Sequence, residues 1–189
     1  MTEPLVTPVV DPRRGCLLVA TPLLEDPNFR RSVIFVIEHG AEGSLGVVLN
    51  RPSTRSLEPL LPEWATSEIV SPKVFVGGPV QPDALLALVP TSADLPGGNK
   101  ITEDVSLLDL EVETSMSAAD AAAVRFYFGY SGWSPGQLRL EIEEGAWWTF
   151  ESTAEAFMCE PADCWRTILA QQKSAARFLS IYPDQSYMN

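Results

Sequence analysis

Histidine and cysteine are scarce in this sequence of 189 residues, which contains one histidine, His39, and three cysteines. A catalytic triad built on histidine therefore depends on His39 alone. Cys16, Cys159 and Cys164 cannot all pair with one another and contain no C-x-x-C spacing, so the sequence indicates neither a disulfide framework nor a zinc site. We interpret the cysteines as buried free thiols, and we predict no metal ion and no cofactor.

Long hydrophobic runs are also missing. The purest apolar stretch, residues 33–37, ends at Glu38 and is far shorter than the ~20 residues that span a bilayer. Residues 1–11 lack the basic and apolar regions of a secretory signal. We therefore predict a cytoplasmic protein without a transmembrane segment. Its length and its 46% of apolar residues fit one globular domain, residues 1–189, with residues 1–12 as a flexible N-terminal tail.

Positive charge is deficient, and it is unevenly placed. The net charge is −12, and residues 1–55 hold six arginines and six acidic residues, so the whole excess of negative charge lies in residues 56–189. Binding of DNA or RNA draws most of its non-specific affinity from contacts between cationic side chains and phosphates. The global charge therefore argues against nucleic acid as a partner, although a local positive patch in the N-terminal part keeps that alternative open.

Short runs of branched and aromatic residues predict strands in most of the chain. We expect strands at residues 16–20, 32–37, 45–49, 73–76, 84–89, 124–130 and 146–150, with a hairpin loop at 38–43 and a long mobile loop at 91–104. Helices are expected near residues 57–64, after the Ser117-x-x-Asp120 capping pattern, and over residues 161–173. This irregular mixture favours an α+β domain whose strands are buried on both faces.

The segment Gly132-Trp133-Ser134-Pro135-Gly136 matches the G-x-S-x-G pattern of serine hydrolases. In that mechanism the residue after the serine donates its main-chain N–H to the oxyanion, and Pro135 has none. His39 lies upstream rather than downstream, so the order of the triad is wrong as well. We instead interpret Ser134 and Pro135 as the N-cap and first residue of a helix over residues 137–144, a segment whose alternating leucines also suit a strand.

Several other residues are candidates for binding. Gly77-Gly78-Pro79 follows a strand and could present main-chain amides to an anion, but a tight turn is the better interpretation. Asn50-Arg51-Pro52 with Arg30 and Arg31 could form an anion site, but a turn with arginines paired to carboxylates is favoured. Glu141, Glu143 and Glu144 are expected to be solvated, and most of the tryptophans to be core residues.

Read together with its neighbours, Gly129-Tyr130-Ser131-Gly132-Trp133-Ser134-Pro135-Gly136-Gln137-Leu138 resembles the signature segment of the YqgE/AlgH family of bacterial proteins. Further motifs agree in order: Asp26-Pro27-x-Phe29-Arg30-Arg31-Ser32-Val33, Gly46-Val47-Val48-Leu49-Asn50-Arg51-Pro52 and Gly77-Gly78-Pro79-Val80. The resemblance implies a single α+β domain with a branched, partly barrel-like β-sheet flanked by helices. One branch of the family is labelled a transcriptional regulator of exopolysaccharide production. Val89 stands where many members have a histidine.

These observations favour a non-catalytic protein with a regulatory role that binds a small ligand or a protein partner. The alternatives are a transcriptional regulator acting directly on nucleic acid and, less favoured, a serine hydrolase that uses Ser134. The candidate binding surface comprises Asn50, Arg51, Gly77, Gly78, Pro79, Trp133, Gln137 and Glu141.

Overall fold

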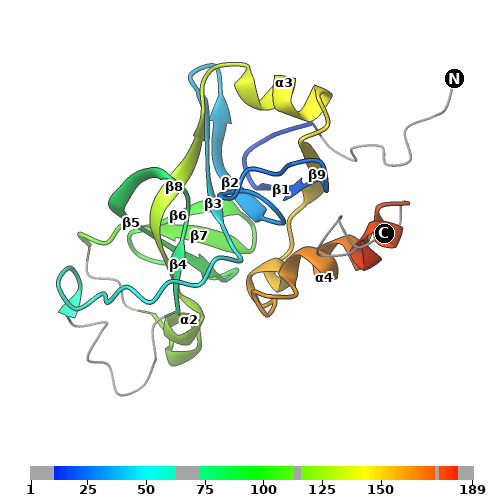
Figure 1. The fold of residues 1–189 in the computed structure, drawn as a ribbon. Coiled ribbons are helices and arrows are strands. Elements are labelled where there is room, and N and C mark those ends of the chain that lie inside the picture. Colours follow the sequence, from blue (N-terminus) through cyan, green and yellow to red (C-terminus); the bar gives the residue numbers. More distant parts are fainter. Residues whose placement is uncertain (1–10, 63–72, 113–115, 173–174, 183–189) are drawn as a thin grey trace, which may run out of the picture.

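The computed structural model describes residues 11–62, 73–112, 116–172 and 175–182. In this part of the chain nine strands form one curled sheet in the order β6-β7-β5-β8-β3-β2-β1-β9, and β4 pairs with β8 outside that path (Figure 1). The strands are β1 (Cys16–Ala20), β2 (Val33–Gly40), β3 (Gly43–Val48), β4 (Lys73–Val76), β5 (Val80–Pro90), β6 (Gly98–Thr102), β7 (Val105–Leu108), β8 (Arg125–Trp133) and β9 (Trp147–Glu151). The fold is α+β with a half-barrel sheet, as predicted.

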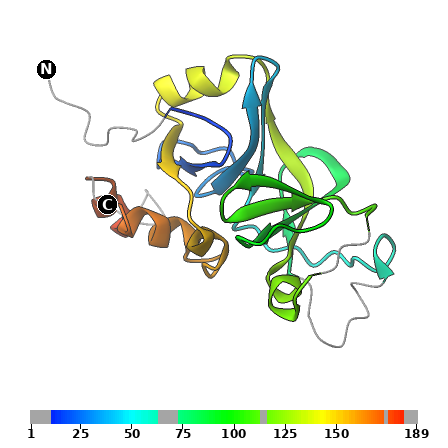
Figure 2. The same ribbon diagram turned by 180° about the vertical axis from the view of Figure 1, so that it is seen from behind.

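The helices lie around the sheet rather than within it. They are α2 (Ala118–Ala123), α3 (Gln137–Glu143) and α4 (Cys164–Ala170), with the 3-10 helices η1 (Ala154–Phe157) and η2 (Ala175–Ile181). Figures 1 and 2 show α3 and α2 at opposite ends of the sheet, and α4 with η2 beside β1 and β9. None of these helices is long and apolar enough to cross a membrane, a finding that covers the described residues.

The sheet branches at β8. Strand β5 pairs with one edge of β8, while β4 pairs in parallel with the first half of the opposite edge and β3 pairs with its last residues. Every other pairing in the sheet is antiparallel. A nine-residue strand can serve three neighbours because each of its edges offers a separate row of main-chain hydrogen-bonding groups.

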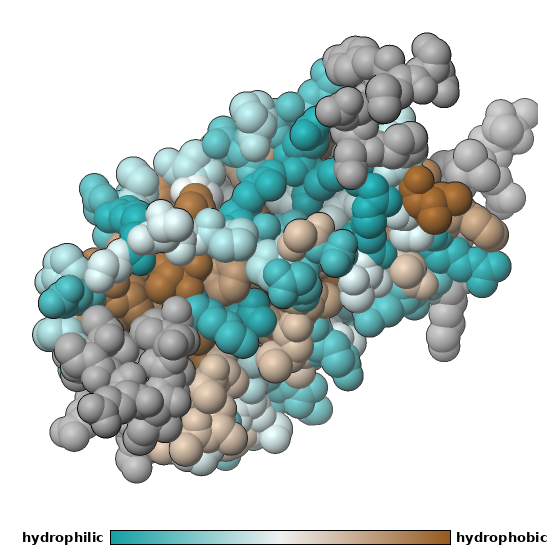
Figure 3. Space-filling view, turned by 60° about the horizontal axis from the view of Figure 1, so that its bottom comes forward, coloured by the Kyte–Doolittle hydropathy of each residue, from teal (hydrophilic) through white to brown (hydrophobic). Residues whose placement is uncertain are grey.

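The central strands are buried on both faces, as their continuous apolar sequences predict. Along β1, Leu17 and Val19 join a core under α4 and η1, whereas Leu18 and Ala20 join a second core under α3. This alternation follows from the two-residue period of a strand. A third core lies over β5, β7 and β8 and includes Leu57. Figure 3 shows mostly hydrophilic residues on the face turned toward the viewer, with hydrophobic residues gathered in small patches.

Most of the predicted elements are confirmed, and the capping pattern is among them. The Ser117 hydroxyl accepts a hydrogen bond from the Asp120 N–H at the start of α2. The helix predicted over residues 137–144 is found at 137–143, and Gly145 lies just beyond it with the left-handed φ of 84° that ends many helices. The helix predicted over residues 161–173 is shorter than expected, since α4 covers Cys164–Ala170.

Two predictions about local structure are wrong. Residues 91–104 are not one long loop, because β6 and β7 form a hairpin there and β7 was not predicted at all. The polar side chains of β6 suit an edge strand that pairs on one side only. Residues 57–61 form a turn rather than a helix, and residues 63 and 64 of that predicted helix lie outside the described residues. The predicted tail likewise falls mainly on residues 1–10, which are not described.

The start of α3 also differs from its prediction. Strand β8 continues to Trp133, so Ser134 and Pro135 belong to the connection, and the helix begins at Gln137 after a left-handed Gly136. The Ser134 hydroxyl therefore does not cap the helix. Instead, the Gln137 side chain accepts a hydrogen bond from the Ser134 main-chain N–H at 2.9 Å.

Candidate functional site

The glycine pair at residues 77 and 78 lets one strand connection cross another strand. The chain passes from β4 to β5 across β8, since these two strands lie on opposite edges of β8. A Cβ at Gly77 or Gly78 would overlap the main chain of β8 at Gly129 or Tyr130. The Gly77 N–H already donates to the Phe128 carbonyl at 2.8 Å. The tight turn predicted here is therefore a crossing that requires close main-chain approach.

Asn50 holds the beginning of β2 in place. Its side-chain oxygen accepts from the Val33 N–H at 3.0 Å, and its side-chain amide donates to the Arg31 carbonyl at 2.9 Å. Arg51 donates to the carbonyl of Arg30 at 2.6 Å. Burial, and then the charge of Arg30, lowers the pKa of Arg51 from its ordinary value. The predicted pairing of the arginines with carboxylates is wrong for Arg51, which donates to a main-chain carbonyl.

Trp133, Gln137 and Glu141 come together in a cluster that anchors α3 to the sheet. One oxygen of Glu141 accepts from the indole N–H groups of Trp133 at 2.9 Å and Trp147 at 2.8 Å. Its other oxygen accepts from the Gln137 amide at 2.9 Å. The two indole rings also meet edge to face, with centroids 6.1 Å apart. The expectation that Glu141 is solvated is therefore wrong, because three donors surround its carboxylate.

His39 lies closer to Ser134 than their separation in sequence suggests. It belongs to β2, and its ring bonds through Nδ1 to the Ser44 hydroxyl at 2.7 Å. Ser44 in turn pairs with Trp133, the residue before Ser134. The imidazole is thus bonded to Ser44 rather than to Ser134, and Pro135 removes the donor that an oxyanion hole would need. The hairpin loop predicted at residues 38–43 is shorter than expected, because β2 runs to Gly40 and β3 begins at Gly43, and the His39 side chain is half-buried.

A cleft of about 260 Å³ lies where the first residues of β4 and β8 meet the segment between η1 and α4. Its apolar lining consists of Pro52, Val74, Phe75, Met158 and Pro161, and its polar lining of Lys73, Arg125, Cys159 and Glu160. A concave surface with an apolar lining and few polar groups is typical of small-ligand sites. None of the polar residues of this cleft is among the site residues predicted from the sequence.

Arg125 is the most unusual residue of the cleft. Only 4% of it is exposed, and its Nε has no hydrogen-bond partner among the described residues. Its guanidinium lies over the ring of Phe75, 5.1 Å from the centroid. In the parallel register Arg125 pairs with Lys73, so two cations are neighbours at the start of adjacent strands. Neither of them forms an ion pair with an acidic side chain of the described chain.

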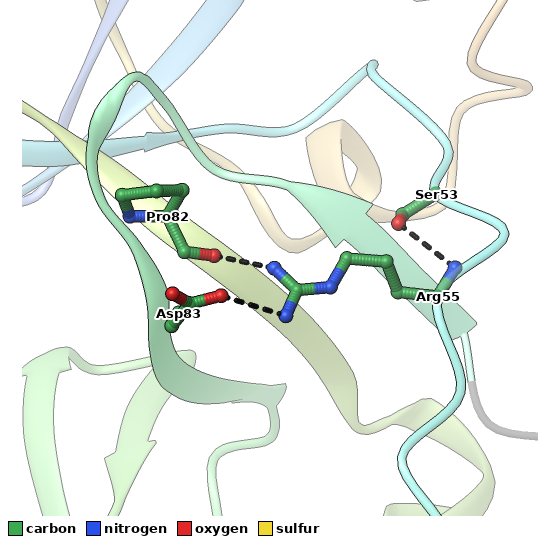
Figure 4. Close-up of polar contacts among 4 residues, drawn as sticks. All are labelled: Ser53, Arg55, Pro82 and Asp83. Atoms are coloured by element: carbon green, nitrogen blue, oxygen red, sulfur yellow. Dashed lines mark hydrogen bonds and ion pairs between the residues drawn. The ribbon is translucent and has the colours of Figure 1, made fainter.

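Arg55 is an arginine of this fold that has hydrogen-bond and ion-pair partners, and it serves as a comparison for Arg125. It also covers an aromatic ring, that of Phe128, at 3.9 Å from the centroid. Its guanidinium donates to the Pro82 carbonyl at 2.5 Å and pairs with Asp83 at 3.0 Å (Figure 4). These contacts tie the segment after β3 to the bulged start of β5. Arg125 has the aromatic contact, but no carbonyl or carboxylate of the described residues is bonded to it.

Two further groups lie near Arg125. Tyr127, two residues along β8 and therefore on the same face, stacks on Phe75 at 5.5 Å, and its buried hydroxyl has no partner among the described residues. Burial raises the pKa of Tyr127 above its ordinary value. Burial also raises the pKa of the Cys164 thiol, beneath the cleft on α4. All three cysteines are free. In the described ranges, no group of three His, Cys, Asp or Glu side chains could hold a metal ion.

The cleft brings together segments that are far apart in sequence, which is why sequence reasoning missed it. One signal was available: Arg125 is an arginine inside an otherwise apolar and aromatic strand. Such a residue is almost never buried without a partner. The predicted surface, by contrast, divides into a cluster at α3, a strand crossing and a turn, whose polar atoms are largely bonded within the chain.

Comparison with known proteins gives a consistent set of relatives. The family model described as AlgH-like matches residues 17–177. A UPF0301 protein of Streptomyces coelicolor is 41% identical over 182 residues, covering 93% of this chain and 94% of that protein. A UPF0301 protein of Mycobacterium tuberculosis is 39% identical over 177 residues, covering 90% of this chain and 88% of that protein.

Two solved structures share the fold. The crystal structure of protein DIP2367 from Corynebacterium diphtheriae superposes with a TM-score of 0.77 at 24% identity, covering 92% of this chain and 94% of that chain. The solution structure of the AlgH protein from Pseudomonas aeruginosa superposes with a TM-score of 0.60 at 27% identity, covering 83% of this chain and 86% of that chain.

Proposed function

The chain belongs to the AlgH-like family, and from this premise we propose that it is a non-catalytic protein that binds a small ligand and acts in regulation. The observation that carries the proposal is the cleft of about 260 Å³ between β4, β8 and the segment before α4. Its volume lies just below the ~300–1,000 Å³ of typical ligand pockets and so suits only a small molecule, and its apolar walls with a few polar groups suit specific binding. We place this activity in the cytoplasm, where free thiols such as those of Cys159 and Cys164 are kept reduced.

The geometry at Ser134 argues against acyl transfer at this segment. Its main-chain N–H is bonded to the Gln137 side chain, the next residue is a proline, and the imidazole of His39 is bonded elsewhere. A family-wide hydrolase mechanism at this segment would need an oxyanion donor worth roughly 3–4 kcal/mol, which Pro135 cannot supply.

A fragment screen followed by amide chemical shifts tests the proposal. Compounds that bind are expected to shift the amide signals of Val74, Phe75 and Met158, which line the cleft. The amides around Glu141 serve as the internal control, since that cluster lies under α3 and not at the cleft. Ligands that shift only the Glu141 region, or no compound that shifts the cleft at all, would refute the assignment.

The same spectra test the surface predicted from the sequence, which comprises Asn50, Arg51, Gly77, Gly78, Pro79, Trp133, Gln137 and Glu141.

Direct action on nucleic acid is tested by fluorescence anisotropy with DNA and RNA at several salt concentrations. With a net charge of −12, we expect weak binding at every concentration. Tight binding that falls steeply with salt would replace a small-ligand function by a nucleic-acid function.

A further inference from the structure

The guanidinium of Arg125 is buried, and no acidic side chain of the described residues forms an ion pair with it. It is 4% exposed, lines the cleft and has an Nε–H that donates to nothing in the described chain. Removing a charge from water is costly unless hydrogen bonds and an opposite charge replace the lost hydration. The contact with Phe75 covers one face of the guanidinium but accepts none of its N–H groups in the ring plane.

The neighbouring charges increase this imbalance. Lys73 stands opposite Arg125 in the register of β4 and β8, and like charges in directly paired positions repel each other. Glu160 is the one carboxylate that lines the cleft, and it forms no ion pair with either cation among the described residues. The cleft therefore carries two positive groups against one negative group.

We propose that the ligand of the cleft is a small organic oxyanion. Its carboxylate or phosphate group is held by Arg125 and Lys73, and its apolar body lies against Phe75 and Met158. A guanidinium presents N–H groups as a planar fork that matches two oxygens of such a group, and the ammonium of Lys73 adds a second charge. This inference rests on the proposed function and names the class of ligand that the same cleft accepts.

Three probes of similar shape separate the contribution of charge from that of shape. Phenyl phosphate and benzoate carry an oxyanion on an aromatic ring, and benzyl alcohol is a neutral analogue of the same size. Thermal unfolding of the full chain is followed at millimolar concentrations of each probe, and cleft binding is checked from the amide signals of Phe75 and Met158. We expect both anions to raise Tm and to shift these signals, and benzyl alcohol to do neither.

Variants locate the effect on the two cations. Arg125→Met keeps the length and apolar character of the side chain, and it is expected to weaken binding of phenyl phosphate by about 10- to 100-fold, the loss of a charge-assisted hydrogen-bonded pair. Without ligand, its Tm is expected to equal or exceed that of the wild type, because an unpaired buried charge is removed. Lys73→Met, at an exposed position, is expected to weaken binding less. Lys100→Met, which breaks the exposed pair with Asp94 outside the cleft, is the matched control and should bind like the wild type.

The outcomes distinguish the two proposals. If benzyl alcohol binds the cleft as well as the anions do, the ligand class is wrong and the binding function stands. If none of the probes and no screened fragment reaches the cleft, both proposals fail. A third outcome combines two results: Arg125→Met has a strongly lowered Tm, and Lys73→Met binds phenyl phosphate as tightly as the wild type. In that case Arg125 supports the fold rather than binding a ligand, and the inference is overturned.

Discussion

Replacing Glu141 by alanine removes the acceptor that two buried indole groups share. Trp133 is 6% exposed and Trp147 is 2% exposed, and both donate to the same carboxylate oxygen. Each buried donor left without a partner costs roughly 1–3 kcal/mol, so the two together cost about 2–6 kcal/mol. Alanine has a higher helix propensity than glutamate, which adds about 0.5 kcal/mol to the free energy of unfolding. The expected net loss in the free energy of unfolding is about 1.5–5.5 kcal/mol.

Denaturation by urea, followed by far-UV circular dichroism, measures this loss without relying on the fluorescence of the affected tryptophans. In a thermal melt each kcal/mol corresponds to roughly 2–4 °C in Tm for a chain of this length, so a fall of about 3–22 °C is expected. Glu144→Ala is the matched control. Glu144 follows the same helix and is exposed, so its replacement should stay within about 0.5 kcal/mol of the wild type. If the two variants proved equally stable, water would be a sufficient substitute for the carboxylate and the reasoning would be refuted.

The remaining predictions concern the crossing, the start of β2 and the buried thiols. Gly78→Ala places a methyl group on the main chain of β8 and should destabilise by more than about 3 kcal/mol. Gly136 also has a left-handed φ, but a Cβ at this position would meet no atom within 4 Å, so Gly136→Ala should cost only about 1 kcal/mol. Similar urea midpoints for the Gly78→Ala and Gly136→Ala variants would contradict this comparison. Asn50→Ala leaves two main-chain groups unpaired and should cost about 2–3 kcal/mol in the same assay. Burial raises the pKa of the Cys16 and Cys164 thiols above 9.0, so the unfolded chain loses these protons first and stability should fall as pH rises beyond 9. Between pH 7 and 10 the Tm of Cys164→Ala should fall less than that of the wild type. An equal fall in Tm would show that the Cys164 thiol does not contribute to the pH dependence of stability.

Much of the architecture follows from local patterns in the sequence. Continuous runs of branched residues such as Cys16–Ala20 and residues 33–37 are strands in the structure because such runs suit a sheet covered on both sides. The pattern from Ser117 to Asp120 caps a helix through contacts within four residues. The resemblance of the signature segments to the AlgH-like family extended this reading to the half-barrel sheet.

Other features depended on groups that meet only after folding. The polar strand β6 exists because β7 supplies its hydrogen-bond partners, and no local propensity favours it. Glu141 stands in a run of acidic residues that looks solvated, yet two tryptophans from different strands converge on it. The glycine pair at 77 and 78 looks like a turn until β8 is placed beneath it.

The sequence by itself determined the α+β class, the family and the absence of a donor after Ser134, because each of these depends on residue type and order along the chain. The tertiary structure alone decided where Arg125 lies and what surrounds it. Strand pairing places it beside Lys73, and the packing of the segment before α4 buries it above Phe75. Burial and the lack of a partner are properties of a folded neighbourhood, so a charge becomes a candidate binding site only when the fold has removed its water.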